Sequence, residues 1–439
     1  SCTRGDELSW TGDPTVLENS TLQERVVERV HSSGATVAFC HKPGYLRKYA
    51  CFTTNFGSVD DRFRIGGGSE VSLPDGVAHF LEHKMFEGEK EDAFQEFSRL
   101  GASANAFTGF NGTSYLFSCT DQFYSCLSHL VRFVQSPHFT PENVEKEKGI
   151  IGQEIRMYED MPGWRVYFNL LEAMYANHPV SKDIAGTEES ISGITSPLLD
   201  DCWSAFYHPS NMILFAVGDE SEEEFFEQAD RLLSEKDLGP APLLEKIATS
   251  EELAPAKTEI RQEMHVGRSK LLMGWKDVHP GLSGKEMMHK ELLTDLVLEC
   301  VFGQSGELFE KLQTANLVDD SFGASYMIYG DVGHSAIGGD VAEPDQVRDF
   351  ILEELPAILA KGICTEDIDR QRRAATGQLL RSFNSLENIA GSYCSARFLG
   401  SNPFEVVDLV NKIQSEEVVE RLREHIHPDR MVCSIISPA

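Results

Sequence analysis

One short segment of the chain places two histidines and a glutamate at helical spacing. It reads His79-Phe80-Leu81-Glu82-His83. Because His79 and His83 are four residues apart, their imidazoles share one face of a helix and can reach the same ion. Neutral imidazole nitrogen is a common ligand of zinc. Glu82 stands beside that face, so it could take a proton from water that the metal activates.

The same pattern also arises by chance on amphipathic helices with solvated histidines, so further residues must support it. A catalytic zinc needs a third protein ligand. The acidic segment 145–154 offers Glu147 and Glu154, which are two helical turns apart and therefore lie on one face. One carboxylate could bind the ion while the other orients a ligand. A solvated acidic helix is the alternative interpretation.

Two pairs of segments recur along the chain at nearly the same offset. Residues 208–214 recur as 427–433, and residues 140–154 recur as 365–379. The repetition predicts two related halves.

The metal-type residues occur in only one of these halves. Glu147 aligns with Arg372 and Glu154 with Leu379, while the segment that would match the histidine helix, 292–303, contains no histidine. We therefore expect one half with a metal site and one degenerate half.

The predicted fold class is α+β, with two related α/β halves that each have a mixed antiparallel sheet and helices packed on one side. We expect a zinc-binding catalytic domain at 1–225, a linker at 226–257 and a degenerate domain at 258–439. Strand-like runs include residues 35–42, 49–58, 113–120 and 212–219. Helix-like runs include residues 77–86, 94–101, 121–136 and 142–161.

Composition excludes several classes of function. The 439 residues carry a formal net charge of −31, which argues against nucleic acid as a partner. That charge could attract basic peptides, but a solvated surface is the favoured interpretation. No apolar run is long enough to cross a membrane, and residues 1–14 have no apolar core of a secretory signal. Ten cysteines without a CxxC motif predict free thiols in a reducing, cytoplasmic setting.

Five segments, in order, resemble the pitrilysin/insulysin family of zinc peptidases with the inverted HxxEH motif, which includes mitochondrial processing peptidase. Within that family the chain resembles the short bacterial branch of YmfH type, which is found beside a zinc-less sister chain. The resemblance implies that His79, His83 and Glu154 bind one Zn²⁺ per chain. It implies that Glu82 is the general base and Glu147 a supporting acid. The five segments are 76–88, 101–117, 144–162, 178–191 and 206–219.

The resemblance also assigns Asn105-Ala106-Phe107-Thr108 to an edge strand that pairs with the backbone of a peptide substrate. An ordinary hairpin strand is the alternative for this stretch alone. The implied activity is that of an endopeptidase on peptides or unfolded segments. One chain would form half of a clamshell chamber, so the resemblance implies a dimer.

The second half departs from the family pattern. Members that act alone carry an Arg/Tyr pair there, whereas residues 308–320 contain no arginine and place an aspartate where the tyrosine is expected. This departure implies a partner, either a zinc-less sister subunit that supplies the pair or a second copy of the chain. A non-catalytic subunit or a peptide-binding scaffold of the same fold is the alternative function.

Overall fold

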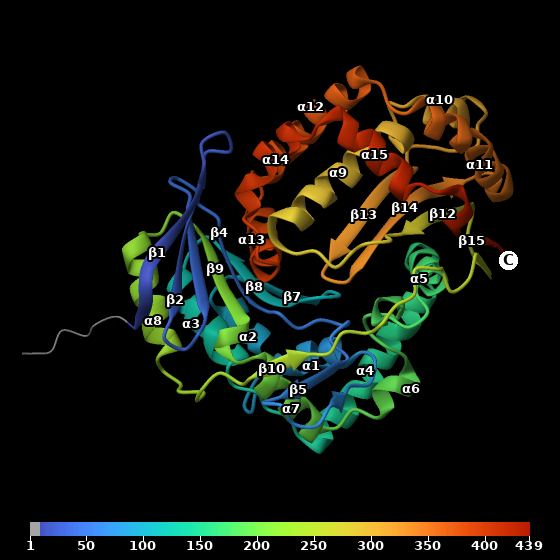
Figure 1. Cartoon of the computed structure of the whole chain (residues 1–439). Helices are drawn as coiled ribbons and strands as arrows, with labels where there is room; N and C mark the ends of the chain where they lie inside the picture. The colour runs from blue at the N-terminus through green and yellow to red at the C-terminus, as the bar shows by residue number, and fades with distance from the viewer. Residues whose placement is uncertain (1–8) are drawn as a thin grey trace, which may run out of the picture. The chain divides into compact units, whose positions relative to one another are not determined.

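The computed structural model describes residues 9–439 (Figure 1). Residues 1–8, part of the segment for which we predict no secretory signal, lie outside the described part. The chain forms two compact units whose segments alternate along the sequence. The first unit contains the residues up to 153, together with 183–247 and 382–398. The second contains 154–182, 248–381 and 399–439.

The first unit is built on a seven-stranded sheet. Only the β3–β9 pair is parallel, and every other pair in this sheet is antiparallel. In spatial order the strands are β1 (Trp10–Asn19), β2 (Glu24–His31), β3 (Thr36–His41), β9 (Met212–Gly218), β4 (Lys48–Thr54), β8 (Thr113–Cys119) and β7 (Ser103–Thr108). A small second sheet joins β10 (Leu244–Lys246), β5 (Arg62–Ile65) and β6 (Val71–Ser72).

Helices cover both faces of the large sheet. Helices α3 and α8 pack against β3, β4 and β8, and Phe123 of α3 lies 5.7 Å from the ring of Phe117. On the opposite face, helix α13 packs against β4 and β9 (Figure 1). Cys394 of this helix lies beside Cys51 of β4. The helices of this unit are α1 (Val77–Met85), α2 (Ala93–Arg99), α3 (Phe123–Val134), α6 (Glu188–Ser192), α7 (Ser196–Phe206), α8 (Glu222–Leu233) and α13 (Leu386–Phe398).

The second unit has a five-stranded sheet of the same topology. In spatial order its strands are β11 (Glu259–Met264), β15 (Val432–Pro438), β12 (Ser269–Lys276), β14 (Val332–Val341) and β13 (Gly323–Tyr329). They match β3, β9, β4, β8 and β7 in order, and again only the first pair is parallel. This correspondence confirms the two related halves that the repeated segments predict.

Helices also cover both faces of the second sheet. On one face, Trp275 of β12 stacks on Phe302 of α9 at 5.8 Å. The other face receives α5, and a Cβ on Gly274 would meet the Met174 side chain at 2.5 Å. The helices are α5 (Pro162–Met174), α9 (Gly284–Phe302), α10 (Glu307–Thr314), α11 (Pro344–Lys361), α12 (Thr365–Ser382), α14 (Val406–Lys412) and α15 (Ser415–His425).

Each half of the sequence contributes one helix to the sheet of the other half, and the sequence patterns did not predict this exchange. Helix α5 belongs to the first half of the sequence but packs on β11, β12 and β15, and α13 belongs to the second half but packs on β4 and β9. The predicted arrangement, with helices on one side of each sheet, therefore holds for the helices that each half contributes to its own sheet. The second side of each sheet is covered by the helix that comes from the other half of the sequence. The stretch 226–257 also differs from a plain linker, because most of α8 and all of β10 lie within it.

The described part of the chain contains nine cysteines, and all are free thiols, as predicted. None of its helices has the length and apolar character needed to cross a membrane.

Candidate metal centre

Helix α1 carries both histidines and is packed on almost every side. It begins after Gly76, whose φ of +94° lies in the left-handed region. A Cβ at this position would meet the Ala185 carbonyl oxygen at 2.4 Å, so glycine is required. Phe80 and Leu81 are fully buried and anchor the helix.

Helix α4 (Pro141–Glu159) carries both glutamates on one continuous helix. Its start is set by Thr140 and Asn143, whose side chains each accept a hydrogen bond from the other's backbone N–H at 3.1 and 3.0 Å. Pro141 occupies the first helical position, where its missing N–H costs nothing. The boundary between the two compact units falls within this helix, after Gln153.

The two helices bring His79, His83 and Glu154 together. One ligand atom from each of the three lies within 4.8 Å of the others. The two imidazole rings are 4.5 Å apart between centroids. Across residues 9–439, no other set of three or more such side chains is gathered as closely. Two imidazoles and a carboxylate form the donor set of many catalytic zinc sites, so these residues fit the ion.

Glu147 contacts the Nδ1 atom of the His83 ring. The His83 Nδ1 to Glu147 Oε1 distance is 3.0 Å, and Lys84 Nζ donates to Oε2 at 3.0 Å. Burial alone would raise the pKa of the Glu147 carboxyl, but the hydrogen bonds and charges of His83 and Lys84 outweigh it and lower the pKa. Glu147 is therefore held as a carboxylate that fixes the orientation of the His83 ring.

Glu82 contacts the edge strand. Its Oε2 accepts a 2.8 Å hydrogen bond from the Thr108 hydroxyl at the end of β7. The side chain of Glu82 is buried. The carboxylate therefore stands between the histidine helix and the strand predicted to bind substrate.

That strand, β7, has only one neighbour in the sheet. It pairs with β8, and no strand within residues 9–439 pairs with its other edge. Its residues alternate between exposed and half-buried, and Phe107 is 53% exposed. The Ala106 N–H donates to Asn105 Oδ1 at 2.8 Å. The predicted segment Asn105–Thr108 is thus an edge strand, as expected.

The structure adds two residues that the sequence reasoning missed. Tyr158 donates its hydroxyl to Glu154 Oε1 at 2.7 Å, and its ring stacks on Trp164 at 4.5 Å. The four-residue spacing from Glu154 to Tyr158 on one helix could have revealed it. Lys84 is fully buried and pairs with Glu147 and Glu87. The position of Lys84 next to His83 in the sequence did not indicate that it would be buried and paired with Glu147.

The equivalent positions in the second half make different contacts. Arg372 pairs with Asp369 at 2.5 Å and donates to the Ile413 carbonyl at 2.6 Å. Leu379 packs against the apolar core of the second unit. These positions carry no metal-type group.

Two family models match successive parts of the chain. "Insulinase (Peptidase family M16)" matches residues 62–188, which include the histidines and both glutamates. "Peptidase M16 inactive domain" matches residues 193–375.

Whole-chain comparisons agree with these models. The chain is 42% identical to "Uncharacterized zinc protease YmfH" of Bacillus subtilis over 96% of this chain and 98% of the relative. It is also 24% identical to "Probable mitochondrial-processing peptidase subunit beta" of Schizosaccharomyces pombe. This match covers 82% of this chain and 79% of the relative.

Solved structures share the fold. An M16-like peptidase from Alicyclobacillus acidocaldarius superposes with a TM-score of 0.92 at 35% identity, over 96% of this chain and 100% of that one. Pitrilysin superposes with a TM-score of 0.76 at 18% identity, over 98% of this chain but 47% of its own. By sequence and by fold, the chain belongs to the insulinase family of peptidases, M16.

Proposed function

We propose that the chain is a zinc-dependent endopeptidase that hydrolyses peptides or unfolded segments. The observation that carries this proposal is the grouping of ligand atoms from His79, His83 and Glu154 within 4.8 Å of one another. The buried Glu82, which precedes His83 in the sequence, accepts a hydrogen bond from the edge strand β7. Relatives named as zinc proteases support the same activity.

The three grouped residues would hold one zinc ion per chain. When bound, zinc polarises the scissile carbonyl and lowers the pKa of a water molecule so that it can attack at neutral pH. Glu147 would orient one of these ligands, because its hydrogen bond to His83 Nδ1 would leave the Nε2 atom of His83 available for the ion.

Glu82 is assigned as the general base. Its Oε2 is engaged by the Thr108 hydroxyl, so we assign Oε1 to take the proton from the attacking water. The same carboxyl then returns the proton to the leaving amine. Removal of the charge at Glu82 should therefore stop hydrolysis without removing any metal ligand.

The open edge of β7 is assigned as the binding site of the substrate backbone. Asn105, Ala106, Phe107 and Thr108 would pair with an extended peptide, which requires little of its sequence. The Ala106 N–H, which Asn105 Oδ1 accepts in the free structure, would instead donate to the peptide. An extended substrate is one reason to expect peptides and unfolded segments rather than folded proteins.

A partner is also part of the proposal. Helix α10 and the residues after it, 308–320, lack the Arg/Tyr pair, and the chain spans 47% of pitrilysin. We propose a dimer that encloses a chamber, with a zinc-less sister subunit supplying the pair, or otherwise a homodimer. We place it in the cytoplasm because its buried thiols suit a reducing compartment.

The sister-subunit proposal is tested by assaying the chain alone and together with its sister, with the oligomeric state followed by light scattering. A large gain in activity on mixing supports the borrowed pair. Full activity of the chain alone contradicts it.

A non-catalytic subunit or peptide-binding scaffold is the second candidate. The match of residues 193–375 to a model named "inactive domain" favours a passive role for that half. A scaffold would bind peptides without cleaving them.

The replacement Glu82→Gln separates the two candidates. We expect the variant to retain about one zinc per chain by elemental analysis, as a three-ligand site predicts, and to lose peptide hydrolysis. Retained turnover would rule out Glu82 as the base. A wild-type chain that binds zinc and peptide but cleaves nothing would identify the scaffold.

A further inference from the structure

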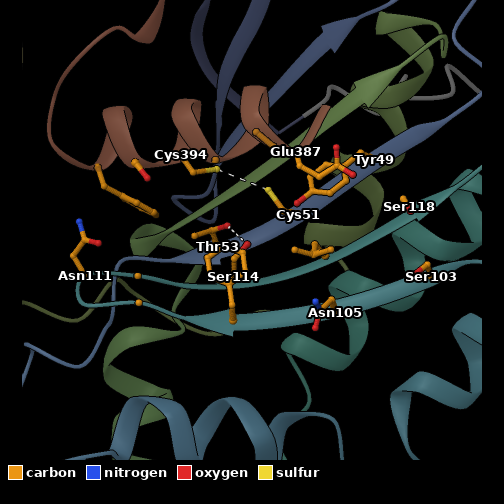
Figure 2. A pocket seen from close by; sticks show the side chains of 18 of the residues that line it. Tyr49, Cys51, Thr53, Ser103, Asn105, Asn111, Ser114, Ser118, Glu387 and Cys394 are labelled. Carbon is orange, nitrogen blue, oxygen red and sulfur yellow. Dashed lines mark hydrogen bonds between the residues drawn. The ribbon is translucent and has the colours of Figure 1, made fainter. Parts of the chain in front are cut away.

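A groove lies on the face of the first sheet that the proposed reaction does not use. It has a volume of about 420 Å³, and all its lining residues belong to the first unit. Figure 2 shows it between β7 and helix α13, with Asn105 on one side and Cys394 on the other.

The floor of the groove consists of three cross-strand rows. Each row takes one residue from β7, its partner on β8 and the next partner on β4. Because side chains alternate along a strand, all nine residues face the same side of the sheet. The rows are Ser103–Ser118–Tyr49, Asn105–Leu116–Cys51 and Phe107–Ser114–Thr53.

The remaining side chains of β7 face the other way. Thr108, whose hydroxyl donates a hydrogen bond to Glu82, is an odd number of residues from Asn105 and Phe107, so its side chain points to the opposite face of the sheet. Strand β7 therefore presents one face to the proposed base and the other to the groove. A peptide that pairs with its open edge would place every second side chain on the groove side.

Helix α13 forms the wall opposite β7, and it leaves room there. Cys394 Sγ approaches Cys51 Sγ to 3.9 Å, which brings the helix close to β4. Gly391 also lines the groove, and outside the adjacent residues and backbone of its own helix a Cβ placed on it would meet no atom of the described residues within 4 Å. A side chain at position 391 would therefore occupy space that is open in the wild-type protein.

The chemistry of the lining favours uncharged ligands. Arg47 and Glu387 are its only charged residues, and they pair with each other. The Thr53 and Ser114 hydroxyls bond to each other at 2.8 Å. Phe107 offers an aromatic ring that is 53% exposed. A bulky apolar or aromatic side chain would cover this ring without leaving a charge unpaired.

We propose that this groove selects bulky apolar or aromatic side chains at alternate positions of the bound peptide, with Gly391 as the specificity-determining residue. The inference rests on the proposed function, because it takes the peptide to lie along β7.

The test uses short alanine-rich peptides in which one phenylalanine is moved through successive positions. Binding to the full-length Glu82→Gln chain is measured by fluorescence anisotropy, and kcat/KM is measured with the wild-type catalytic site. Each readout is repeated with Gly391→Leu, which adds a bulky side chain at a residue of the groove lining while improving helix propensity. Gly377→Leu is the matched control, since Gly377 lies in α12, outside the groove, and also has open space around its Cβ.

We expect phenylalanine to be preferred at positions two residues apart. At those positions, Gly391→Leu should reduce the ratio of the values for the phenylalanine and alanine peptides, in affinity and in kcat/KM, roughly tenfold or more. This is the range that a few methylenes contribute to discrimination. Gly377→Leu should leave the ratio unchanged. A preference without alternation, a ratio that Gly391→Leu does not alter, or no binding of any peptide would each overturn the inference. Alternating binding without cleavage by the wild-type chain would support the groove and contradict the proposed hydrolysis.

Discussion

The Thr108 hydroxyl donates a 2.8 Å hydrogen bond to Oε2 of Glu82. The bond joins the last residue of the edge strand to the glutamate that lies between the two histidines in the sequence motif, although 26 positions separate Thr108 from Glu82. The strand assigned to substrate and the carboxylate assigned to proton transfer therefore hold each other in place. A disturbance of this contact should affect the chemical step more than peptide binding.

Replacement of Thr108 by valine tests this coupling. Valine keeps the shape of threonine and removes the hydroxyl, so Glu82 loses one orienting hydrogen bond. A hydrogen bond to a charged group contributes about 1.5–3 kcal/mol, which corresponds to a fall in kcat of roughly 10- to 100-fold. KM should change less, and Thr108→Ser should restore most of the rate. Steady-state kinetics with equal zinc content would check this, and a valine variant within twofold of wild type would contradict it.

Replacement of Glu147 by glutamine should weaken zinc binding. Glutamine preserves the volume but not the charge that holds His83 Nδ1 and Lys84 Nζ. Groups of this kind behind a ligand typically change metal affinity about 10- to 100-fold. Competition with a chelator measures the change. Glu145→Gln is a matched control two residues earlier on α4, because that side chain is 70% exposed. Equal zinc affinity for both variants would exclude the orienting role.

Replacement of Tyr158 by phenylalanine removes the hydroxyl that donates to Glu154 Oε1 and preserves the ring that stacks on Trp164. We expect zinc affinity to fall about tenfold, because the carboxylate loses the partner that fixes its orientation. Chelator competition again measures the effect. The exposed Tyr45→Phe serves as control. If Tyr158→Phe binds zinc as tightly as wild type, the hydroxyl does not position the ligand.

Acid should destabilise the second unit through two buried histidines. Burial lowers the pKa of His334 to about 4 and that of His425 to about 3. Their neutral rings bond to Tyr167, Tyr175 and Ser335. The unfolded chain binds these protons near pH 6.5, so stability is fully present above that pH and is lost as the pH falls toward 4 and 3. At about 1.4 kcal/mol per pKa unit, the full loss is of order 3 kcal/mol for His334 and of order 5 kcal/mol for His425.

Thermal unfolding between pH 7 and 4, with a chelator present so that metal release does not contribute, measures this dependence. His334→Gln should flatten part of the slope, whereas the exposed His265→Gln should not change it. Parallel profiles for wild type and His334→Gln would show that acid acts elsewhere.

Local spacing was enough to locate the candidate site in the sequence. The His79–His83 interval, the position of Glu82 and the interval between Glu147 and Glu154 are helical periodicities, which need only a few residues to be read. The repeated segments likewise showed two related halves, and the structure confirms them in the matching order and pairing of five strands. The family followed from the same motifs, and the comparisons confirm it.

The spacing of the two glutamates left their roles open, and only the family resemblance implied which of them binds the metal. The tertiary structure shows the contacts of each glutamate, and it alone placed the exchanged helices. Spacing could not tell Glu147 from Glu154, because both lie on one helical face. Packing of α4 against α1 puts Glu154 beside both imidazoles and Glu147 against His83 Nδ1. The contact of α13 with β4 joins residues 343 positions apart, as between Cys51 and Cys394. Such contacts depend on how distant apolar surfaces are buried, and no local period in the sequence records that.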